Sequence, residues 1–214
     1  MFGSKRERTR PEAVLYGLYL YYLGLSLRDV ACALDPFVKR SHVSVWKWIQ
    51  ILGKKGIFHR RKVSAFLVDE TYVRVGHYEA WVWVAIEPMH RYILGVYLSR
   101  LRNILVAEFF LNSLVKTYGR HVVYSDEGVW YPDACRSLGL EHKIHTPYEK
   151  SLIERVNQCI KDRTEVFDDY YPCRKQGCNL SHVRRWLYLF SFMYNEMKRN
   201  IRFNALLRLM EVSR

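Results

Sequence analysis

The sequence predicts an α/β protein in which a mixed five-stranded sheet is flanked by helices and preceded by a small all-helical module. Two observations lead to this prediction. Apolar residues recur at helical spacing up to about residue 53, and from residue 64 onward they alternate or run continuously, as they do in strands. Half of the 214 residues are hydrophobic and 15% are aromatic, so we expect a packed core rather than disorder.

The N-terminal module is expected to contain three helices within residues 11–53. Pro11 suits a first helical position, and Gly24 suits the end of that helix. Ser26, with an acidic residue three positions later, caps a short second helix. Ser41 begins a third, amphipathic helix. A short helix, a turn and an amphipathic helix are typical of a helix-turn-helix that reads DNA, although three short helices also form caps that pack against a neighbouring domain.

The rest of the chain predicts a sheet built from a meander and two further strands. We expect strands at 65–75, 80–86, 92–99, 121–125 and 141–145, and helices at 103–118, 131–138, 151–167 and from 180 onward. Three strands with short connections imply an antiparallel meander, and the whole order is that of a ribonuclease H-like fold. The predicted segments are a basic arm (1–10), the helix-turn-helix module (11–53), a basic linker (54–63), the ribonuclease H-like domain (64–200) and a C-terminal helical tail (201–214).

The charge balance favours a polyanionic partner. Lys and Arg total 34 against 21 Asp and Glu, a net charge of +13. Each phosphate that such a protein neutralises releases counterions and adds affinity, although a basic protein can also lack this partner or lie on an acidic membrane. The apolar run 13–25 is too short to span a bilayer, so we expect a core helix and no membrane partner. Five cysteines without a regular framework predict reduced thiols in a cytoplasmic, nucleoid-associated protein.

Three carboxylates are predicted to be the catalytic and metal-binding residues. Asp69 lies within the first predicted strand, Asp126 ends the fourth, and Glu154 lies on the long helix. A carboxylate in a buried strand is costly unless it is paired or binds a cation, and the end of a strand opens onto the crevice where ligands bind. The alternatives are ordinary structural roles. Asp126 would then cap the next helix, and Glu154 would be a first-turn acid favoured by the helix dipole.

The long helix carries two stripes at helical spacing. The apolar stripe consists of Ile153, Val156 and Ile160, and the polar stripe of Glu154, Gln158 and Lys161. When the apolar stripe docks on the sheet, Glu154 can reach the sheet edge, and Lys161 points along the same face. We therefore expect Lys161 to bind a DNA phosphate. Glu70 and Glu127 are expected to face away from the acids if their strands are regular.

Three acids suit the chemistry of phosphodiester transfer. That reaction uses two divalent ions roughly 3.5–4 Å apart, one activating the attacking oxygen and one stabilising the leaving oxygen. Carboxylate oxygens are hard ligands that suit Mg²⁺, with Mn²⁺ as a second possibility. One aspartate shared by both ions, with a further acid for each, is a sufficient protein contribution. We expect no small-molecule cofactor.

Longer strings of the sequence resemble a known family. FLVDETYVRVG, EAWVWVAIEP, ILGVYLS, VVYSDEGVWYPDACRSLGLEH and ERVNQCIKDRT are similar, in this order, to the catalytic domain of small insertion-sequence DDE transposases of archaea and bacteria. The helical segment SLRDVACAL…SHVSVWKWI is similar to the helix-turn-helix that precedes that domain. The resemblance covers roughly residues 14–200. It implies that Asp69, Asp126 and Glu154 are the catalytic acids and Lys161 the basic residue after the glutamate. In this chain Glu127 separates Asp126 from the glycine that more often follows directly.

The resemblance also implies substrates and partners. We expect binding to the inverted terminal repeats of the element, metal-dependent cleavage that releases 3′-hydroxyls, and transfer of those ends into target DNA. The partner is therefore double-stranded DNA, bound by a homo-oligomer. Base contacts usually come from polar residues near the start of a recognition helix, so the DNA-binding candidates in the N-terminal module are Ser41, His42, Ser44 and Lys47.

Three alternatives remain at this stage. A tyrosine recombinase would use a His-x-x-Arg string, here His182 to Arg185, but the last tyrosine, Tyr194, lies within the same apolar helix. A DNA-binding regulator would combine the helix-turn-helix with an inert, decayed ribonuclease H-like domain. A zinc site would use Cys173, Cys178 and His182, although no second half-site lies nearby.

Overall fold

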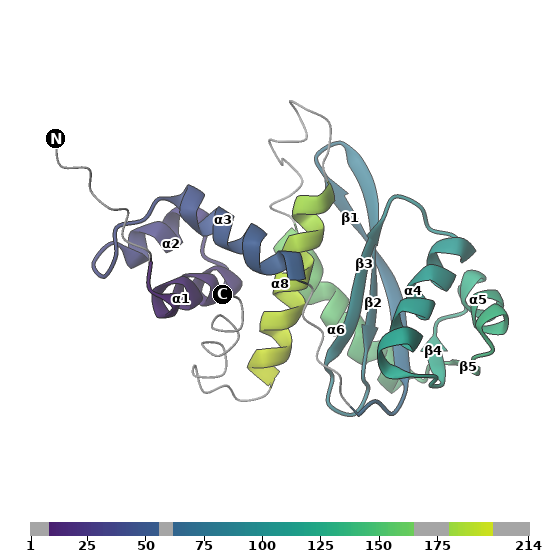
Figure 1. Ribbon diagram of the computed structural model, residues 1–214. Helices are drawn as coiled ribbons and strands as arrows, with labels where there is room; N and C mark the ends of the chain where they lie inside the picture. The colour runs from purple at the N-terminus through teal and green to yellow at the C-terminus, as the bar shows by residue number, and fades with distance from the viewer. Residues whose placement is uncertain (1–8, 56–61, 165–179, 199–214) are drawn as a thin grey trace.

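The structure is a computed structural model that describes residues 9–55, 62–164 and 180–198 (Figure 1). Its elements, in chain order, are α1 (Pro11–Tyr22), α2 (Leu27–Leu34), α3 (His42–Leu52), η1 (Gly53–Lys55), β1 (Phe66–Val75), β2 (Tyr78–Ile86), β3 (Ile93–Ser99), α4 (Ile104–Tyr118), β4 (Val123–Ser125), α5 (Trp130–Leu138), β5 (His142–Ile144), α6 (Pro147–Thr164) and α8 (Leu180–Lys198). Most of the predicted arm, most of the linker and all of the C-terminal tail lie outside the described residues.

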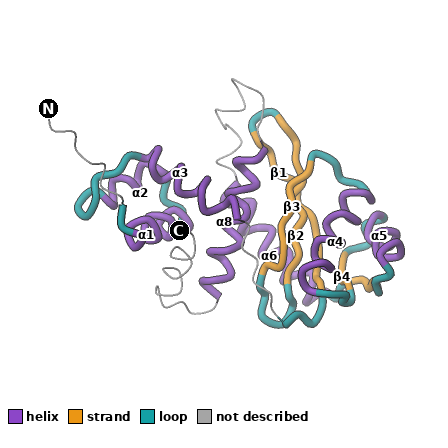
Figure 2. The backbone as a smooth tube through the Cα atoms, in the orientation of Figure 1, coloured by secondary structure: helices purple, strands orange, loops and turns teal. Residues whose placement is uncertain are grey.

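The five strands form one mixed sheet in the order β3-β2-β1-β4-β5 (Figure 2). β1, β2 and β3 pair antiparallel as a meander, and β4 and β5 add to the free edge of β1 in parallel. β1 is therefore the central strand. The sheet order and the helices on both of its faces are those of a ribonuclease H-like fold, as the sequence predicts.

Alternation along β1 separates two hydrophobic cores. Phe66 and Val68 face the core under α4 and α5, whereas Leu67 faces the core under α6 and α8. These three side chains are fully buried. Side chains one residue apart on β1 thus enter different environments, and this matters for the two acids that follow Val68.

Helix α8 covers the meander side of the sheet. Val183, Leu187 and Phe190 lie on its buried face. Further along the helix, the Asn195 side chain accepts a hydrogen bond from the Ile93 N–H and donates one to the Ile93 carbonyl, both at 2.7 Å. Because β3 is the edge strand, this clamp satisfies backbone groups that would otherwise be unpaired.

Helices α1 and α3 pack onto α8, and α2 packs against α1 and α3. Leu15, Leu18 and Ile49 belong to the same buried cluster as the α8 residues, and α8 lies between α3 and the sheet (Figure 1). Gly53, directly after α3, makes the crossing possible, since a Cβ there would stand 2.1 Å from the Arg185 carbonyl oxygen. Among the helices that the structure describes, none is long and apolar enough to cross a bilayer.

Among the described residues, the predicted helices and strands form, and one boundary is displaced by more than two residues. α6 begins at Pro147, four residues before the predicted start at residue 151. Thr146 and Glu149 supply the reason, because the Thr146 N–H donates to the Glu149 carboxylate at 2.7 Å and the Glu149 N–H donates to the Thr146 hydroxyl at 3.4 Å. This is a capping box, and Thr146 with Glu149 three residues later is its sequence signature. Residues 165–167 of the prediction lie outside the described part.

Candidate active site

Asp69 lies in the middle of β1, on the face that α6 covers. Its Oδ2 accepts a hydrogen bond from Asn157 Nδ2 at 2.7 Å, and its Oδ1 accepts one from the Glu70 N–H at 2.8 Å. Burial, together with the charges of Glu70 and Asp126, raises the pKa of Asp69 from 3.8 to about 7. The two hydrogen bonds therefore leave the charged form of this carboxylate incompletely compensated.

Asp126 follows β4 directly and lies beside Asp69. The parallel register pairs Phe66 with Val123 and Leu67 with Tyr124, and the same offset continued two residues further aligns Asp69 with Asp126. The influence of Asp126 on the pKa of Asp69 agrees with this proximity. Like charges held close together favour either a shared proton or a cation between them.

The residues after Asp126 form a tight turn that holds its side chain. Asp126 Oδ1 accepts a hydrogen bond from the Gly128 N–H at 3.0 Å. A Cβ at position 128 would lie 2.8 Å from that same oxygen, so only glycine fits without displacing the carboxylate. Glu127 is exposed to solvent. The additional residue between Asp126 and the glycine therefore adds an exposed side chain and leaves the Asp126–Gly128 hydrogen bond in place.

Glu154 lies on the exposed side of α6, in the wall of the cavity that Asp69 opens onto. This cavity has a volume of about 540 Å³, and its lining includes Asp69, Glu154, Asn157, Gln158 and Lys161. The Glu154 side chain is 58% exposed, and its Oε1 lies 3.9 Å from Lys150 Nζ. Because α6 begins at Pro147, Glu154 is not in the first turn, and the helix-dipole interpretation of this residue is wrong.

The structure brings the acids toward one another without joining them as ligands. Among the described residues, no three His, Cys, Asp or Glu side chains form a group placed to hold a metal ion. The donor set nevertheless suits a hard divalent cation. Asp69 has a raised pKa, and the buried Asn157 Oδ1 has no hydrogen-bond partner. The carboxylate oxygens of Asp69 and the amide oxygen of Asn157 are hard donors of the kind that Mg²⁺ and its bound waters contact.

Comparison with known proteins decides the family. The family model of the DDE domain of IS240-type transposases matches residues 63–198, more than half of the chain. This chain belongs to the DDE transposase family. A relative over nearly its whole length is the uncharacterized protein MJ0017 of Methanocaldococcus jannaschii, 32% identical over 199 residues, which cover 91% of this chain and 90% of that protein.

Solved structures similar to this transposase include retroviral integrases. The catalytic core domain of BIV integrase is 19% identical, with a TM-score of 0.44 over 59% of this chain and 81% of that one. The HTLV-2 integrase catalytic core domain in complex with magnesium (trimeric form) is 14% identical, with a TM-score of 0.44 over 60% of this chain and 86% of that one.

Two features of the transposase site were not predicted from its sequence. Asn157, three residues after Glu154, bonds to Asp69 and lies between the two stripes that the helix pattern defines. Glu70 faces away from α6, as expected, but it is buried there and bonded to Arg102 and Tyr131. An asparagine one turn after the predicted glutamate was a usable signal for Asn157. No local pattern identifies Arg102 and Tyr131 as partners of Glu70, because they lie 32 and 61 residues away in the sequence.

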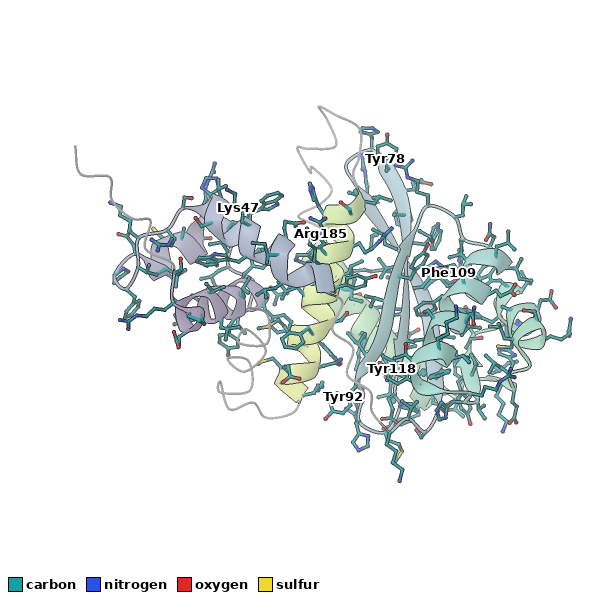
Figure 3. All side chains as sticks on the ribbon, in the orientation of Figure 1. Lys47, Tyr78, Tyr92, Phe109, Tyr118 and Arg185 are labelled. Carbon is teal, nitrogen blue, oxygen red and sulfur yellow. The ribbon has the colours of Figure 1, made fainter. Side chains whose placement is uncertain are left out.

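The DNA-binding candidates on α3 do not all lie on one free surface. Ser41 and Lys47 are exposed, and Ser44 is half-buried with its hydroxyl 3.4 Å from that of Ser41. Lys47 and Arg185 lie on the same side of the molecule, on neighbouring helices α3 and α8 (Figure 3). His42, although exposed, lines a second cavity between the N-terminal helices and α8.

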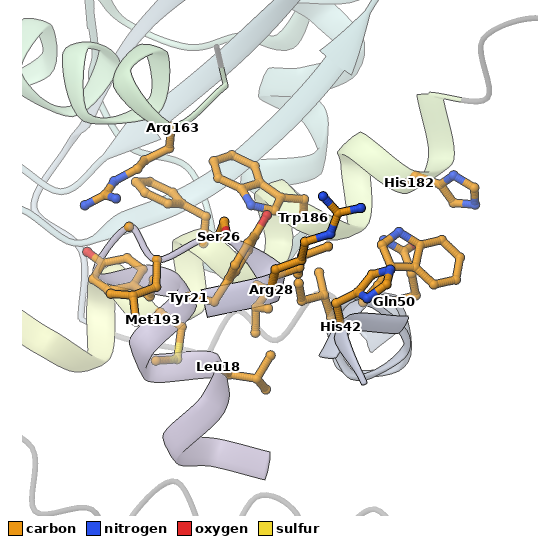
Figure 4. Close-up of a pocket in the computed structure, with 18 of the residues that line it drawn as sticks. Leu18, Tyr21, Ser26, Arg28, His42, Gln50, Arg163, His182, Trp186 and Met193 are labelled. Atoms are coloured by element: carbon orange, nitrogen blue, oxygen red, sulfur yellow. The ribbon is translucent and has the colours of Figure 1, made fainter. Parts of the chain in front are cut away.

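This second cavity also has a volume of about 540 Å³ (Figure 4). Aromatic and cationic side chains line it, including Trp46, Trp186, Arg28 and Arg163, and His42 stands at its α3 wall. Trp46 meets the ring of His182 edge-on, with centroids 5.3 Å apart. Trp46 therefore belongs to the junction of α3 and α8.

The described residues give no support to the tyrosine recombinase alternative. Burial raises the pKa of Tyr194 to about 12, whereas a nucleophilic tyrosine benefits from a lowered pKa. Cys173 and Cys178, the cysteines of the alternative zinc site, lie outside the described residues.

Proposed function

We propose that this transposase binds the terminal inverted repeats of an insertion sequence and catalyses metal-dependent DNA cleavage and strand transfer. The observation that carries the proposal is the proximity of Asp69 to Asp126 on adjacent parallel segments, with Glu154 in the wall of the cavity that Asp69 lines. In the cell, the protein would act in the cytoplasm on double-stranded DNA, as a homo-oligomer that holds two element ends.

Each residue of the site has a role in this proposal. Asp69 would contact both of two Mg²⁺ or Mn²⁺ ions, Asp126 one of them and Glu154 the other. Bound metal would polarise the phosphate oxygens and activate the attacking oxygen for an in-line displacement. Asn157 orients Asp69 through its 2.7 Å hydrogen bond, and Lys161 contributes a positive charge to the DNA path along α6.

The helix-turn-helix remains part of the proposal. The exposed side chains of Ser41, His42 and Lys47, at and near the start of α3, support DNA contacts from this helix. Because α3 packs on α8, DNA bound there would have a fixed orientation relative to the sheet. Exposed Arg184 on α8 would add a phosphate contact beside it.

The test is a strand-transfer assay on end-sequence oligonucleotides with Mg²⁺. Asp126→Asn should lower the rate at least about a thousandfold, since a metal ion supplies several kcal/mol of transition-state stabilisation and each ~1.4 kcal/mol is tenfold. Glu127→Gln, at the exposed neighbouring position, is the matched control and should keep full activity. Equal rates for wild type and Asp126→Asn would refute the proposal. A wild type that binds end DNA specifically but never cuts it would favour the regulator instead.

A further inference from the structure

Glu70 is a buried acid directly beside a proposed metal ligand, on the opposite face of β1. Its side chain is 0% exposed. Arg102 reaches its Oε1 through Nη2 at 2.6 Å and Nε at 2.7 Å, and the Tyr131 hydroxyl donates to its Oε2. A buried carboxylate is tolerated when its charge is neutralised and its oxygens are bonded, and both conditions hold here.

Arg102 is itself held in place by two indole rings. Its Cζ lies 4.5 Å from the centre of the Trp81 ring and 4.3 Å from that of Trp130. The guanidinium therefore lies between β2 and α5, with its donors directed at Glu70. A cation stacked between aromatic faces and bonded twice to one carboxylate has little rotational freedom.

A continuous chain of hydrogen bonds joins the two aspartates through Glu70. The Glu70 N–H donates to Asp69 Oδ1 at 2.8 Å, and the Glu70 carboxylate accepts from the Tyr131 hydroxyl. The Tyr131 N–H donates to the Gly128 carbonyl at 3.2 Å, and the Gly128 N–H donates to Asp126 Oδ1 at 3.0 Å. The Glu70–Tyr131 hydrogen bond therefore connects the residue that donates to Asp69 with the turn that donates to Asp126.

We propose that Glu70, Arg102 and Tyr131 are positioning residues that set the separation and orientation of Asp69 and Asp126 for a divalent cation. This inference rests on the proposed function of the two aspartates. The three residues touch neither metal nor DNA. They act by fixing the strand residue and the turn from which the two ligands extend.

A second buried glutamate provides the comparison that separates positioning from simple stability. Glu87, at the far end of β2, is 2% exposed and accepts a hydrogen bond from the Ser64 hydroxyl and one from the His90 N–H. Among the described residues, neither aspartate is a hydrogen-bond partner of the Glu87 side chain. Removing the Ser64 hydroxyl therefore takes a donor from a buried carboxylate, as removing the Tyr131 hydroxyl does, but away from the site.

The test measures Mn²⁺ binding to the full-length protein, by electron paramagnetic resonance and by calorimetry, without any DNA. Tyr131→Phe should weaken Mn²⁺ binding about tenfold or more, the usual effect of losing a partner that orients a ligand. Ser64→Ala should bind Mn²⁺ as wild type does. Thermal unfolding of both variants shows that each is folded under the conditions of the titration.

A double-mutant cycle and a kinetic readout complete the test. If Glu70 and Tyr131 act as one unit, Glu70→Gln and Tyr131→Phe combined should weaken binding no more than either alone. In strand transfer, Tyr131→Phe should raise the half-saturating Mg²⁺ concentration, and excess Mg²⁺ should restore most of the maximal rate. Wild-type Mn²⁺ affinity in both Glu70→Gln and Tyr131→Phe would overturn this inference and leave the proposed function standing. A wild type that binds no Mn²⁺ would overturn the proposed function, and this inference with it.

Discussion

Asp69 and Glu70 are neighbours on β1, but the two faces of the strand give their carboxylates opposite environments. Glu70 is buried against α5, where an arginine neutralises it and a tyrosine hydroxyl completes its hydrogen bonding. Asp69 faces α6, where an amide and a backbone N–H are its hydrogen-bond donors and a second aspartate stands nearby.

This difference distinguishes a carboxylate that supports the fold from a carboxylate that is available to bind a cation. A buried carboxylate with a full set of partners is part of the framework, and its cost is offset within the protein. A partly buried carboxylate that lacks a neutralising partner has a raised pKa, and a bound cation can neutralise it. One strand here carries both cases, one residue apart.

The largest predicted effect belongs to Asp69→Asn. Strand transfer should fall at least about a thousandfold, because the shared metal ligand is lost. Stability without metal should rise at neutral pH, because the substitution removes a charge that the folded protein compensates poorly. Rate assays and thermal unfolding of the same preparation check both. A variant that is both active and less stable than wild type would contradict this account of Asp69.

The pH dependence of that stability follows from the raised pKa. Asp69 has a pKa of about 7 in the folded protein against an ordinary value of 3.8, so folding favours its protonated form. Metal-free wild type should therefore lose stability as the pH rises from about 4 to about 7, and should then level off. Asp69→Asn should lack this part of the slope. Saturating Mg²⁺ should offset the loss at pH 7, by about 2.7 kcal/mol at one hundred times its Kd.

Glu70→Ala should act in the opposite direction on stability. It leaves the guanidinium of Arg102 and the hydroxyl of Tyr131 without their common partner. Removing one member of a buried ion pair typically costs about 3–5 kcal/mol, and we expect a loss toward the lower end because Arg102 is partly exposed. Urea unfolding measures it. A stability equal to that of wild type would show that the two faces of β1 do not differ as described.

Much of the environment of Asp69 could be predicted from the sequence, but little of the environment of Glu70 could. The apolar stripe of Ile153, Val156 and Ile160 predicted which face of α6 docks on the sheet, and all three are buried. Helical periodicity is a local property, so it survives in the sequence. The parallel register that aligns Asp69 with Asp126 depends on how two distant segments pair, and no local pattern encodes it.

The network around Glu70 illustrates the same limit. Alternation predicted that its side chain turns away from α6, and this is confirmed by its bonds to Arg102 and Tyr131. The pattern could not show whether that other face is solvent or core, because the partners come from separate loops and helices. A glutamate in a strand of otherwise buried residues was the one available hint.

The smallest predicted effect belongs to Asn157→Ala. The substitution removes the 2.7 Å hydrogen bond to Asp69 Oδ2 while leaving the acids in place. Activity should fall about tenfold, the lower end for a partner that orients a metal ligand, and the half-saturating Mg²⁺ concentration should rise. Cys159→Ala, two residues further along α6 at an exposed position outside the cavity lining, is the matched control and should change neither value by more than about twofold. A tenfold loss in both variants would assign the effect to the helix rather than to Asn157.

The most direct test of the account is a crystal structure grown with Mn²⁺ and measured at the manganese absorption edge. We expect two anomalous peaks roughly 3.5–4 Å apart, with Asp69 between them, Asp126 on one and Glu154 turned inward from Lys150 onto the other. Peaks that involve none of these three carboxylates, or Asp69 and Asp126 with no peak at saturating Mn²⁺, would contradict it.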